Sequence, residues 1–119
     1  MTSGYIEVVT TTECREDAER IARRLIDDRL AACVQISGPI TSVYRWKGQV
    51  ETAVEWQCRA KSRADLFERL EAAIRQIHPY EVPEILAMPV SQGVADYVRW
   101  LDEQLCPPRT DGAPTGSSV

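Results

Sequence analysis

Seven consecutive residues, 78–84, hold the chain's single histidine, a tyrosine and two glutamates, with two prolines among them. Each proline fixes its own φ and favours an extended conformation in the residue before it, so this segment is predicted to be a stiff loop. Stiff polar loops at the edge of a scaffold are frequent positions of binding sites. Imidazole and carboxylate groups are ligands of divalent cations such as Cu(II) and Zn(II). The candidate metal contacts are therefore His78, Glu81 and Glu84.

The same loop also has a purely structural interpretation. In it Tyr80 packs, the prolines shape the entry into the next strand, and His78 caps the end of the preceding helix. A single histidine is weak evidence of a metal site, because a stable site for Cu(II) or Zn(II) needs about three or four protein ligands. A site here would need carboxylates or a cysteine beside His78, including groups from another subunit. The sequence leaves both interpretations open.

The composition is that of one globular domain of 119 residues with a net charge of −4. Arginines are interleaved with acidic residues, as in residues 16–20, and do not gather into the basic stripe that nucleic-acid binding requires. No apolar run approaches the ~18 residues that cross a membrane, and residues 1–4 lead directly into a strand pattern. The expected protein is soluble and cytoplasmic, with no nucleic-acid or membrane partner.

The four cysteines lie far apart in the chain, at Cys14, Cys33, Cys58 and Cys106. No Cys-x-x-Cys motif occurs, so neither a zinc cluster nor a thioredoxin-like pair is encoded. Cys33 lies within the apolar run 30–36, where burial raises the pKa of a thiol and makes it inert. Cys33 is therefore predicted to be a structural thiol, and Cys106 the thiol most open to oxidation.

Hydrophobic periodicity predicts strands and helices in the order β-α-β-β-α-β-α. The expected strands are residues 5–11, a second strand in two segments (30–36 and 43–46, with a break at 37–39), 50–61 and 85–90. The first expected helix ends near residue 28, and the other two cover 66–77 and 94–105. Thr12 is expected to cap the first helix, and residues 62–65 to form a capping box before the second. Two split βαβ units of this kind predict an α+β, ferredoxin-like antiparallel sheet with two helices on one face, plus an extra C-terminal helix. Residues 1–105 form the predicted domain, and residues 106–119 a disordered tail.

The two hairpin arms around residues 47–49 are long for so small a domain. At about 3.3 Å per residue the ribbon would extend beyond the sheet and expose its hydrogen-bonding edges. Aromatic residues along it, Tyr44, Trp46 and Trp56, are predicted to pack rather than to bind a ligand. Another copy of the same chain is the expected cover.

Five motifs, taken in order along the chain, resemble the CutA divalent-cation-tolerance family. They are residues 30–34 (LAACV), residues 44–48 (YRWKG), Glu55 with Lys61, residues 78–85 (HPYEVPEI), and Tyr97 with Trp100. The resemblance covers about residues 5–105. It implies a homotrimer similar to the PII signalling proteins, in which the long ribbons extend the sheets of neighbouring subunits. It also implies a role in tolerance of, or response to, divalent metal ions, copper in particular.

The family's proposed copper ligands are only partly present. In members thought to bind copper, a thiol ends the first strand and a second histidine precedes the His-Pro-Tyr motif. The matching positions here are Thr10 and Ile77, so His78 alone remains of that set. No cofactor is expected to be obligatory, and Cu(II) or another divalent cation is the candidate ligand.

An alternative function is a PII-like regulatory trimer that binds a small metabolite in the clefts between subunits. The candidate cleft residues are Arg45, Lys61, Tyr80 and Trp100, beside Glu84. A cleft with apolar walls and a few fixed charges suits a small anion or metabolite. No nucleophile, phosphate-binding loop or paired-carboxylate motif stands out, so the expected protein is not an enzyme.

Overall fold

The computed structural model describes residues 4–108 and contains one four-stranded antiparallel sheet and three α-helices. The sheet has the order β2-β3-β1-β4, built from β1 (Tyr5–Thr12), β2 (Cys33–Trp46), β3 (Gln49–Arg63) and β4 (Leu86–Val90). The helices are α1 (Arg15–Asp27), α2 (Phe67–Ile77) and α3 (Ala95–Gln104). This is the α+β arrangement predicted from two split βαβ units, because both crossovers place their helices on the same side. None of the helices in the described residues is long and apolar enough to span a membrane.

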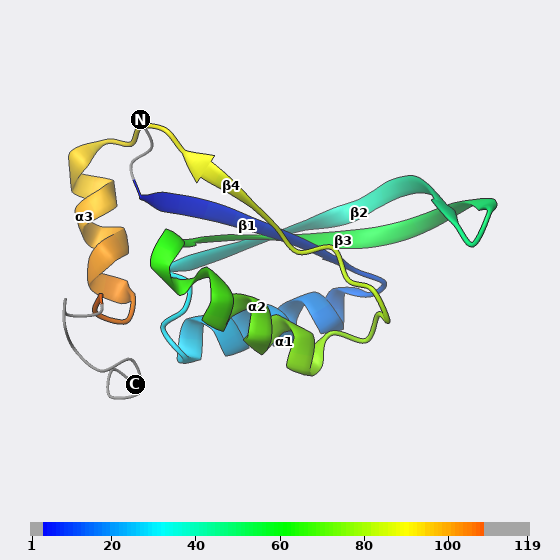
Figure 1. Cartoon of the computed structure of the whole chain (residues 1–119), viewed down its shortest axis with the longest axis horizontal. Coiled ribbons are helices and arrows are strands. Elements are labelled where there is room, and N and C mark those ends of the chain that lie inside the picture. The colour runs from blue at the N-terminus through cyan, green and yellow to red at the C-terminus, as the bar shows by residue number, and fades with distance from the viewer. Residues whose placement is uncertain (1–3, 109–119) are drawn as a thin grey trace.

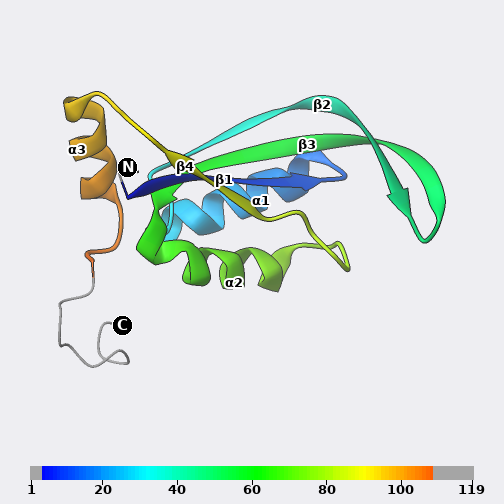
Figure 2. The same ribbon diagram turned by 45° about the horizontal axis from the view of Figure 1, so that its top comes forward.

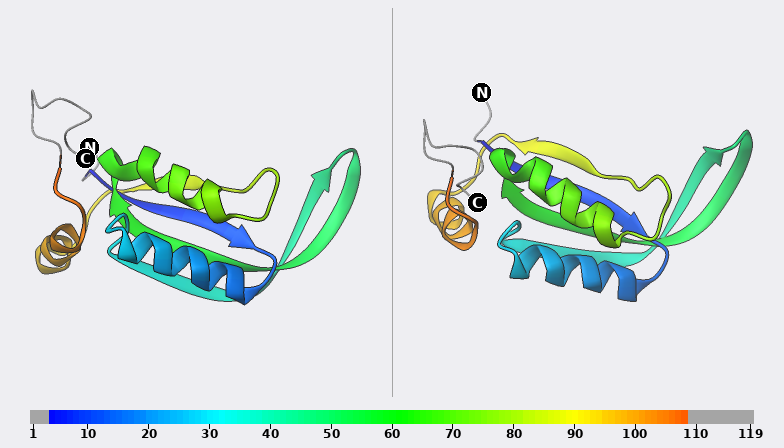
Figure 3. Two further views of the ribbon diagram at one scale, coloured as in Figure 1. Left: turned by 90° about the horizontal axis from the view of Figure 1, so that it is seen from below. Right: turned by 60° about the horizontal axis from the view of Figure 1, so that its bottom comes forward.

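The hydrophobic core lies between the sheet and the pair α1 and α2, which cover one face of it (Figures 1 and 3). Helix α1 contributes Ile21 and Leu25, and α2 contributes Leu70 and Ile74, each almost fully buried. These residues recur at the three- and four-residue spacing of a helix face, as the sequence pattern predicted. The two helices therefore cover one face of the sheet. They do not cover its other face or the ends of its strands.

Strands β2 and β3 extend well beyond this core as a two-stranded ribbon, at the right of Figure 1. The turn at its tip places Lys47 and Gly48 at φ of 51° and 81°, the left-handed conformation that such hairpins require. Along the ribbon Val43, Val50 and Val54 are 67%, 63% and 58% exposed. The predicted overhang is confirmed, and much of its apolar surface is not covered by this chain.

Strand β2 is continuous where the sequence predicted a break at residues 37–39. The pairing with β3 shifts register between Ser37 and Ile40, so the chain bulges and then resumes the ladder. Gly38 lies at this bulge because a Cβ there would stand 2.6 Å from the Trp56 ring. Glycine and proline inside a strand pattern usually mark its end, but here the bulge accommodates the Ser-Gly-Pro sequence within one continuous strand.

Both predicted helix caps are wrong. The hydroxyl of Thr12 donates to the Cys14 carbonyl at 2.8 Å, and α1 begins only after Cys14. Ser62 donates to the carbonyl of Leu30 at 2.6 Å, which ties β3 to the start of β2. Helix α2 then follows a 3₁₀ turn, Ala64–Leu66. In each case the hydroxyl satisfies a carbonyl elsewhere instead of the helix N–H groups.

Helix α3 lies at the end of the sheet opposite the ribbon tip (Figures 1 and 2). It is attached by Leu101, which belongs to the hydrophobic core, and by polar contacts. Arg63 is buried and donates to Asp102 at 3.0 Å and to the Cys106 carbonyl at 2.7 Å. Tyr5 donates to the same Asp102 carboxylate at 2.9 Å. The predicted tail lies, from residue 109 onward, outside the described residues.

A buried hydroxyl in β1 gives a stability prediction. The Thr10 Oγ1 atom is buried without a hydrogen-bond partner among the described residues, whereas Thr12 uses its hydroxyl. Thr10→Val removes an unsatisfied polar atom at nearly constant volume and is expected to raise the free energy of unfolding by about 1 kcal/mol. Thr12→Val is expected to lower it by a similar amount. Equilibrium urea unfolding at matched protein concentration measures both, and a Thr10→Val protein less stable than the parent contradicts the assignment.

Candidate functional site

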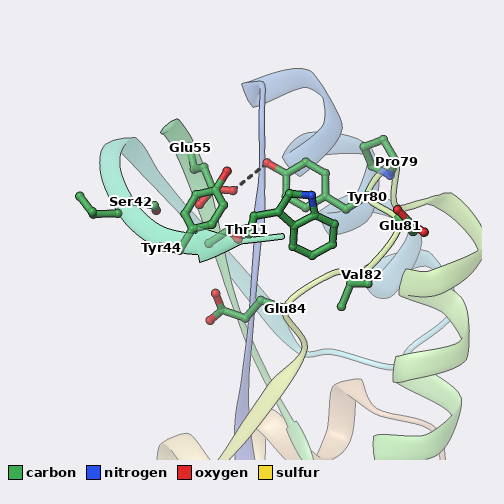
Figure 4. A pocket seen from close by; sticks show the side chains of 11 residues that line it. Thr11, Ser42, Tyr44, Glu55, Pro79, Tyr80, Glu81, Val82 and Glu84 are labelled. Atoms are coloured by element: carbon green, nitrogen blue, oxygen red, sulfur yellow. Dashed lines mark hydrogen bonds between the residues drawn. The ribbon is translucent and has the colours of Figure 1, made fainter. Parts of the chain in front are cut away.

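A cavity of about 710 Å³ opens between the ribbon and the loop that follows α2. Its walls come from β1, β2, β3 and residues 79–84, so it forms where the ribbon leaves the core. Its side chains are shown in Figure 4 and comprise Thr11, Ser42, Val43, Tyr44, Trp46, Glu55, Pro79, Tyr80, Glu81, Val82 and Glu84. This size lies within the ~300–1,000 Å³ of small-molecule sites.

A carboxylate and a phenol form the polar centre of the cavity. The Tyr80 hydroxyl donates to Glu55 Oε2 at 2.7 Å, the dashed contact in Figure 4. Glu55 is only 7% exposed. Burial is the main cause that raises the pKa of Tyr80, and the hydrogen bond to Glu55 raises it further. The Tyr80 hydroxyl therefore stays protonated and remains a donor. This pair joins β3 to the loop.

A second carboxylate lies close enough to Glu55 to respond to its charge. Burial of its carboxyl group raises the pKa of Glu84, and the negative charge of Glu55 raises it further. Glu84 is an exposed residue, so its burial is only partial. Together with Glu81, these groups give the cavity three carboxylates, and none of its lining residues is Lys, Arg or His.

His78 uses both ring nitrogens inside the protein. Its Nε2 lies 2.8 Å from the Thr11 carbonyl, and its Nδ1 accepts the Tyr80 backbone N–H at 3.1 Å. A carbonyl needs a donor and an N–H needs an acceptor, so the ring is the neutral tautomer with the proton on Nε2. Burial lowers the pKa of His78, and the Thr11 carbonyl, Asp17 and Glu55 offset part of that effect. The imidazole therefore positions the loop against the end of β1.

The three candidate metal contacts do not come together as a ligand set. His78 is buried at the start of the loop and does not line the cavity, while Glu81 and Glu84 are exposed residues that line it. Within residues 4–108, no three His, Cys, Asp or Glu side chains are grouped as a metal site requires. Thr10 and Ile77, which the sequence resemblance matched to proposed ligand positions, are buried and half-buried.

Of the predicted cleft residues, only Tyr80 lines the cavity together with Glu84. Arg45 lies near the ribbon tip and donates to the Gly48 carbonyl. Lys61 contacts Gln35 and Glu7 at the other end of β3. Trp100 packs against Tyr97 in α3 with the two rings tilted and their centroids 5.5 Å apart. One protomer does not bring these four residues together.

Comparison with known proteins gives a consistent result. Residues 6–104 match the family model described as CutA1 divalent ion tolerance protein. The chain is 41% identical over 96 residues to the divalent-cation tolerance protein CutA of Thermus thermophilus, which covers 81% of this chain and 93% of that one. It is 43% identical over 104 residues to human protein CutA, covering 83% of this chain and 58% of the human protein. The chain belongs to the CutA1 divalent ion tolerance family.

Solved structures of CutA proteins have the same fold. The Thermus thermophilus protein superposes with a TM-score of 0.83 at 39% identity, covering 85% of this chain and 98% of that one. CutA1 of Oryza sativa gives a TM-score of 0.84 at 36% identity, covering 87% and 95%. The Archaeoglobus fulgidus protein, described as a periplasmic divalent cation tolerance protein, gives 0.81 at 36% identity, covering 84% and 97%. The chain spans about three fifths of the length of the mammalian CutA proteins it matches.

The cysteines of this CutA1 family member are free thiols. Cys33 is half-buried at the start of β2. Cys58 is the fully buried one; burial raises its pKa to about 11, and its Sγ donates to the Ala18 carbonyl. Cys106 lies against the Asp28 carbonyl and the Arg69 guanidinium. None of the four lines the cavity.

Sequence reasoning missed the central residue of the site. Glu55 occurs in the family motif, but no role was assigned to it. The signal was available in strand alternation, because Tyr44 and Trp46 on β2 share a ribbon face with Glu55 on β3 once Ile40 pairs with Glu55. That register depends on the bulge at residues 37–40, which the sequence pattern does not define.

The environment of His78 predicts a pH dependence. Because burial lowers its pKa below the ordinary value of 6.5, the unfolded chain binds a proton more readily than the folded one. The contribution of His78 to stability is therefore present above pH 6.5 and is lost as the pH falls through 6.5 toward the lower folded-state pKa. Urea unfolding of the parent and His78→Ala proteins between pH 7.5 and 5 measures the difference between them.

His78 is the chain's only histidine, so the difference between the two proteins isolates its titration. The gap in unfolding free energy is expected to narrow as the pH falls. A gap that widens on acidification would mean that the folded protein prefers the imidazolium.

Proposed function

We propose that this CutA1 family member acts in divalent-cation tolerance as a non-enzymatic, cytoplasmic homotrimer whose working site is the Glu55–Tyr80 cavity. The observation that carries this proposal is the use of both His78 nitrogens in the loop's own hydrogen bonds. A group with no free lone pair must break a bond that holds the loop before it can bind a metal. The cavity beside it, in contrast, has the size and the mixed lining of a small-molecule site.

Copper binding at His78, Glu81 and Glu84 is the competing proposal. It would require His78 to release Tyr80 or Thr11, and ligands from a second subunit to complete the set. Binding of a small ligand in the cavity does not require His78 to break either of its hydrogen bonds. We therefore favour the PII-like mode of action, in which the trimer binds a metabolite and metal binding is incidental.

Assembly is supported by one face of the ribbon. Cross-strand pairing puts Val43, Val50 and Val54 on the same side, here called the valine face, and Tyr44 and Trp46 on the other. More than half of each valine is exposed, and Leu86 and Met88 on the edge strand β4 are exposed as well. Uncovered apolar ribbons and strand edges favour association with another chain. The number of three subunits comes from the family resemblance.

The valine face gives a test of assembly. Light scattering of the full chain at micromolar concentration is expected to give three times the protomer mass. Val54→Lys places a charge on the valine face and is expected to shift the protein toward monomer, since a lysine in an apolar interface is desolvated without a partner. Val94→Lys, which changes a valine that is 70% exposed beside α3, is the matched control and should leave the mass unchanged. A monomeric parent protein would remove the assembly proposal.

Metal binding has its own measurement. Competition titrations with Cu(II) and Zn(II) are performed on the parent chain, His78→Ala and Glu81→Gln, at a temperature where circular dichroism shows all three folded. We expect binding weaker than micromolar that changes less than about twofold in either variant, because neither side chain belongs to a preformed ligand set. Submicromolar binding that both substitutions abolish would instead make the 78–84 loop a metal site.

A further inference from the structure

The Glu55–Tyr80 cavity carries negative charge that no basic side chain among its described lining residues balances. Its lining contains Glu55, Glu81 and Glu84 and no basic side chain. The ion pairs formed within residues 4–108 lie elsewhere and include none of these three glutamates. The raised pKa of Glu84 has Glu55 as its second cause, so the two carboxyl groups are close enough to repel each other.

Of the three glutamates, Glu55 has the greatest need of a compensating partner, because it is only 7% exposed. Its hydrogen bond from the Tyr80 hydroxyl replaces one of the several contacts that water would give a carboxylate. A neutral hydroxyl does not compensate for the charge taken out of water. A cation entering the cavity would supply what this site lacks, and an anion would add to the repulsion.

The walls of the cavity are aromatic. Tyr44 and Trp46 stand on the ribbon and Tyr80 on the loop, and Figure 4 shows Tyr44, Glu55 and Tyr80 gathered around the dashed contact. Aromatic faces attract cations through their negative π surface. The chain already illustrates this preference, since the Lys47 ammonium lies 5.7 Å from the centroid of the Trp46 ring.

A bare metal ion does not fit this lining. Divalent cations of the Mg²⁺ and Ca²⁺ type take about six to eight oxygen ligands, and Cu(II) and Zn(II) favour nitrogen and sulfur. The faces of aromatic rings provide neither oxygen ligands nor nitrogen and sulfur ligands. The described part of the chain also groups no three His, Cys, Asp or Glu side chains as a metal site. Carboxylates combined with aromatic faces suit a cation that carries an apolar body.

We propose that the cavity binds a small organic cation, whose ammonium group is held by Glu55 and Glu84 and whose apolar part contacts Tyr44, Trp46 and Tyr80. This inference rests on the proposed function, in which the cavity is the ligand site, and it names the chemical class of the ligand. The small anion or metabolite expected from the sequence came from placing Arg45 and Lys61 at a cleft between subunits, and neither residue lines the cavity of the protomer.

Three probes of similar shape and different charge test the proposal on the full chain. They are phenethylamine, phenethyl alcohol and phenylacetate, compared by ligand-observed NMR titration at neutral pH. Phenethylamine is expected to bind the parent protein at least about tenfold more tightly than the other two probes, since a charge-assisted contact exceeds a neutral one by that order.

The variants are chosen to preserve the fold. Glu55→Gln keeps a carbonyl oxygen that can accept the Tyr80 hydroxyl, and Glu84→Gln changes an exposed residue. Each is expected to weaken phenethylamine binding, Glu55→Gln by about tenfold or more. Glu103→Gln makes the same charge change on α3, outside the cavity, and should leave binding unchanged. The oligomeric mass of every variant is measured alongside.

The outcomes separate the two proposals. Equal or tighter binding of phenethyl alcohol or phenylacetate, lost when the cavity residues are changed, would overturn the organic-cation class and leave the cavity as a ligand site. Phenethylamine binding that survives Glu55→Gln would place the cation elsewhere and overturn the inference. Failure of all three probes to bind an assembled trimer would overturn both the inference and the proposed use of the cavity.

Discussion

The imidazole of His78 is the contact on which the site depends. It joins the end of β1 to the loop after α2, through Nε2 to the Thr11 carbonyl and through Nδ1 to the Tyr80 backbone N–H. Because the ring holds the Tyr80 backbone in place, the Tyr80 hydroxyl reaches Glu55 on β3. Protonation of the ring would put a donor on Nδ1 opposite the Tyr80 N–H and break this link. Burial works against that by lowering the pKa of His78.

The length of the ribbon determines the wall of the cavity that lies opposite the loop. A strand pair that ended with the core would leave residues 79–84 facing solvent. Here β2 and β3 continue past the core, so Tyr44 and Trp46 form a wall opposite the loop. The bulge at residues 37–40 sets which face of the ribbon carries these rings, since a shift of one residue exchanges the two faces. Gly38 and Trp56 maintain that bulge through their close contact.

Much of the fold followed from sequence periodicity, and the site did not. The helices that contain Ile21 and Leu70 were predicted because burial on one face leaves a clear repeat. The caps at Thr12 and Ser62 were wrong because a hydroxyl can satisfy any nearby carbonyl, and only the tertiary structure decides which. The pair at the centre of the cavity was missed for a related reason. Its centre pairs Glu55 with Tyr80, 25 positions apart, and no local pattern records such a contact.

The two faces of the ribbon connect assembly with binding. Val50 and Val54 lie on one side and Tyr44 and Trp46 on the other, so both surfaces belong to the same two strands. A two-stranded ribbon outside a core has few contacts to fix its position. If a second copy covers the valine face, it also fixes the aromatic wall of the cavity. Binding would then require less ordering of the ribbon in the assembled protein than in a free protomer, so assembly and cation binding would favour each other.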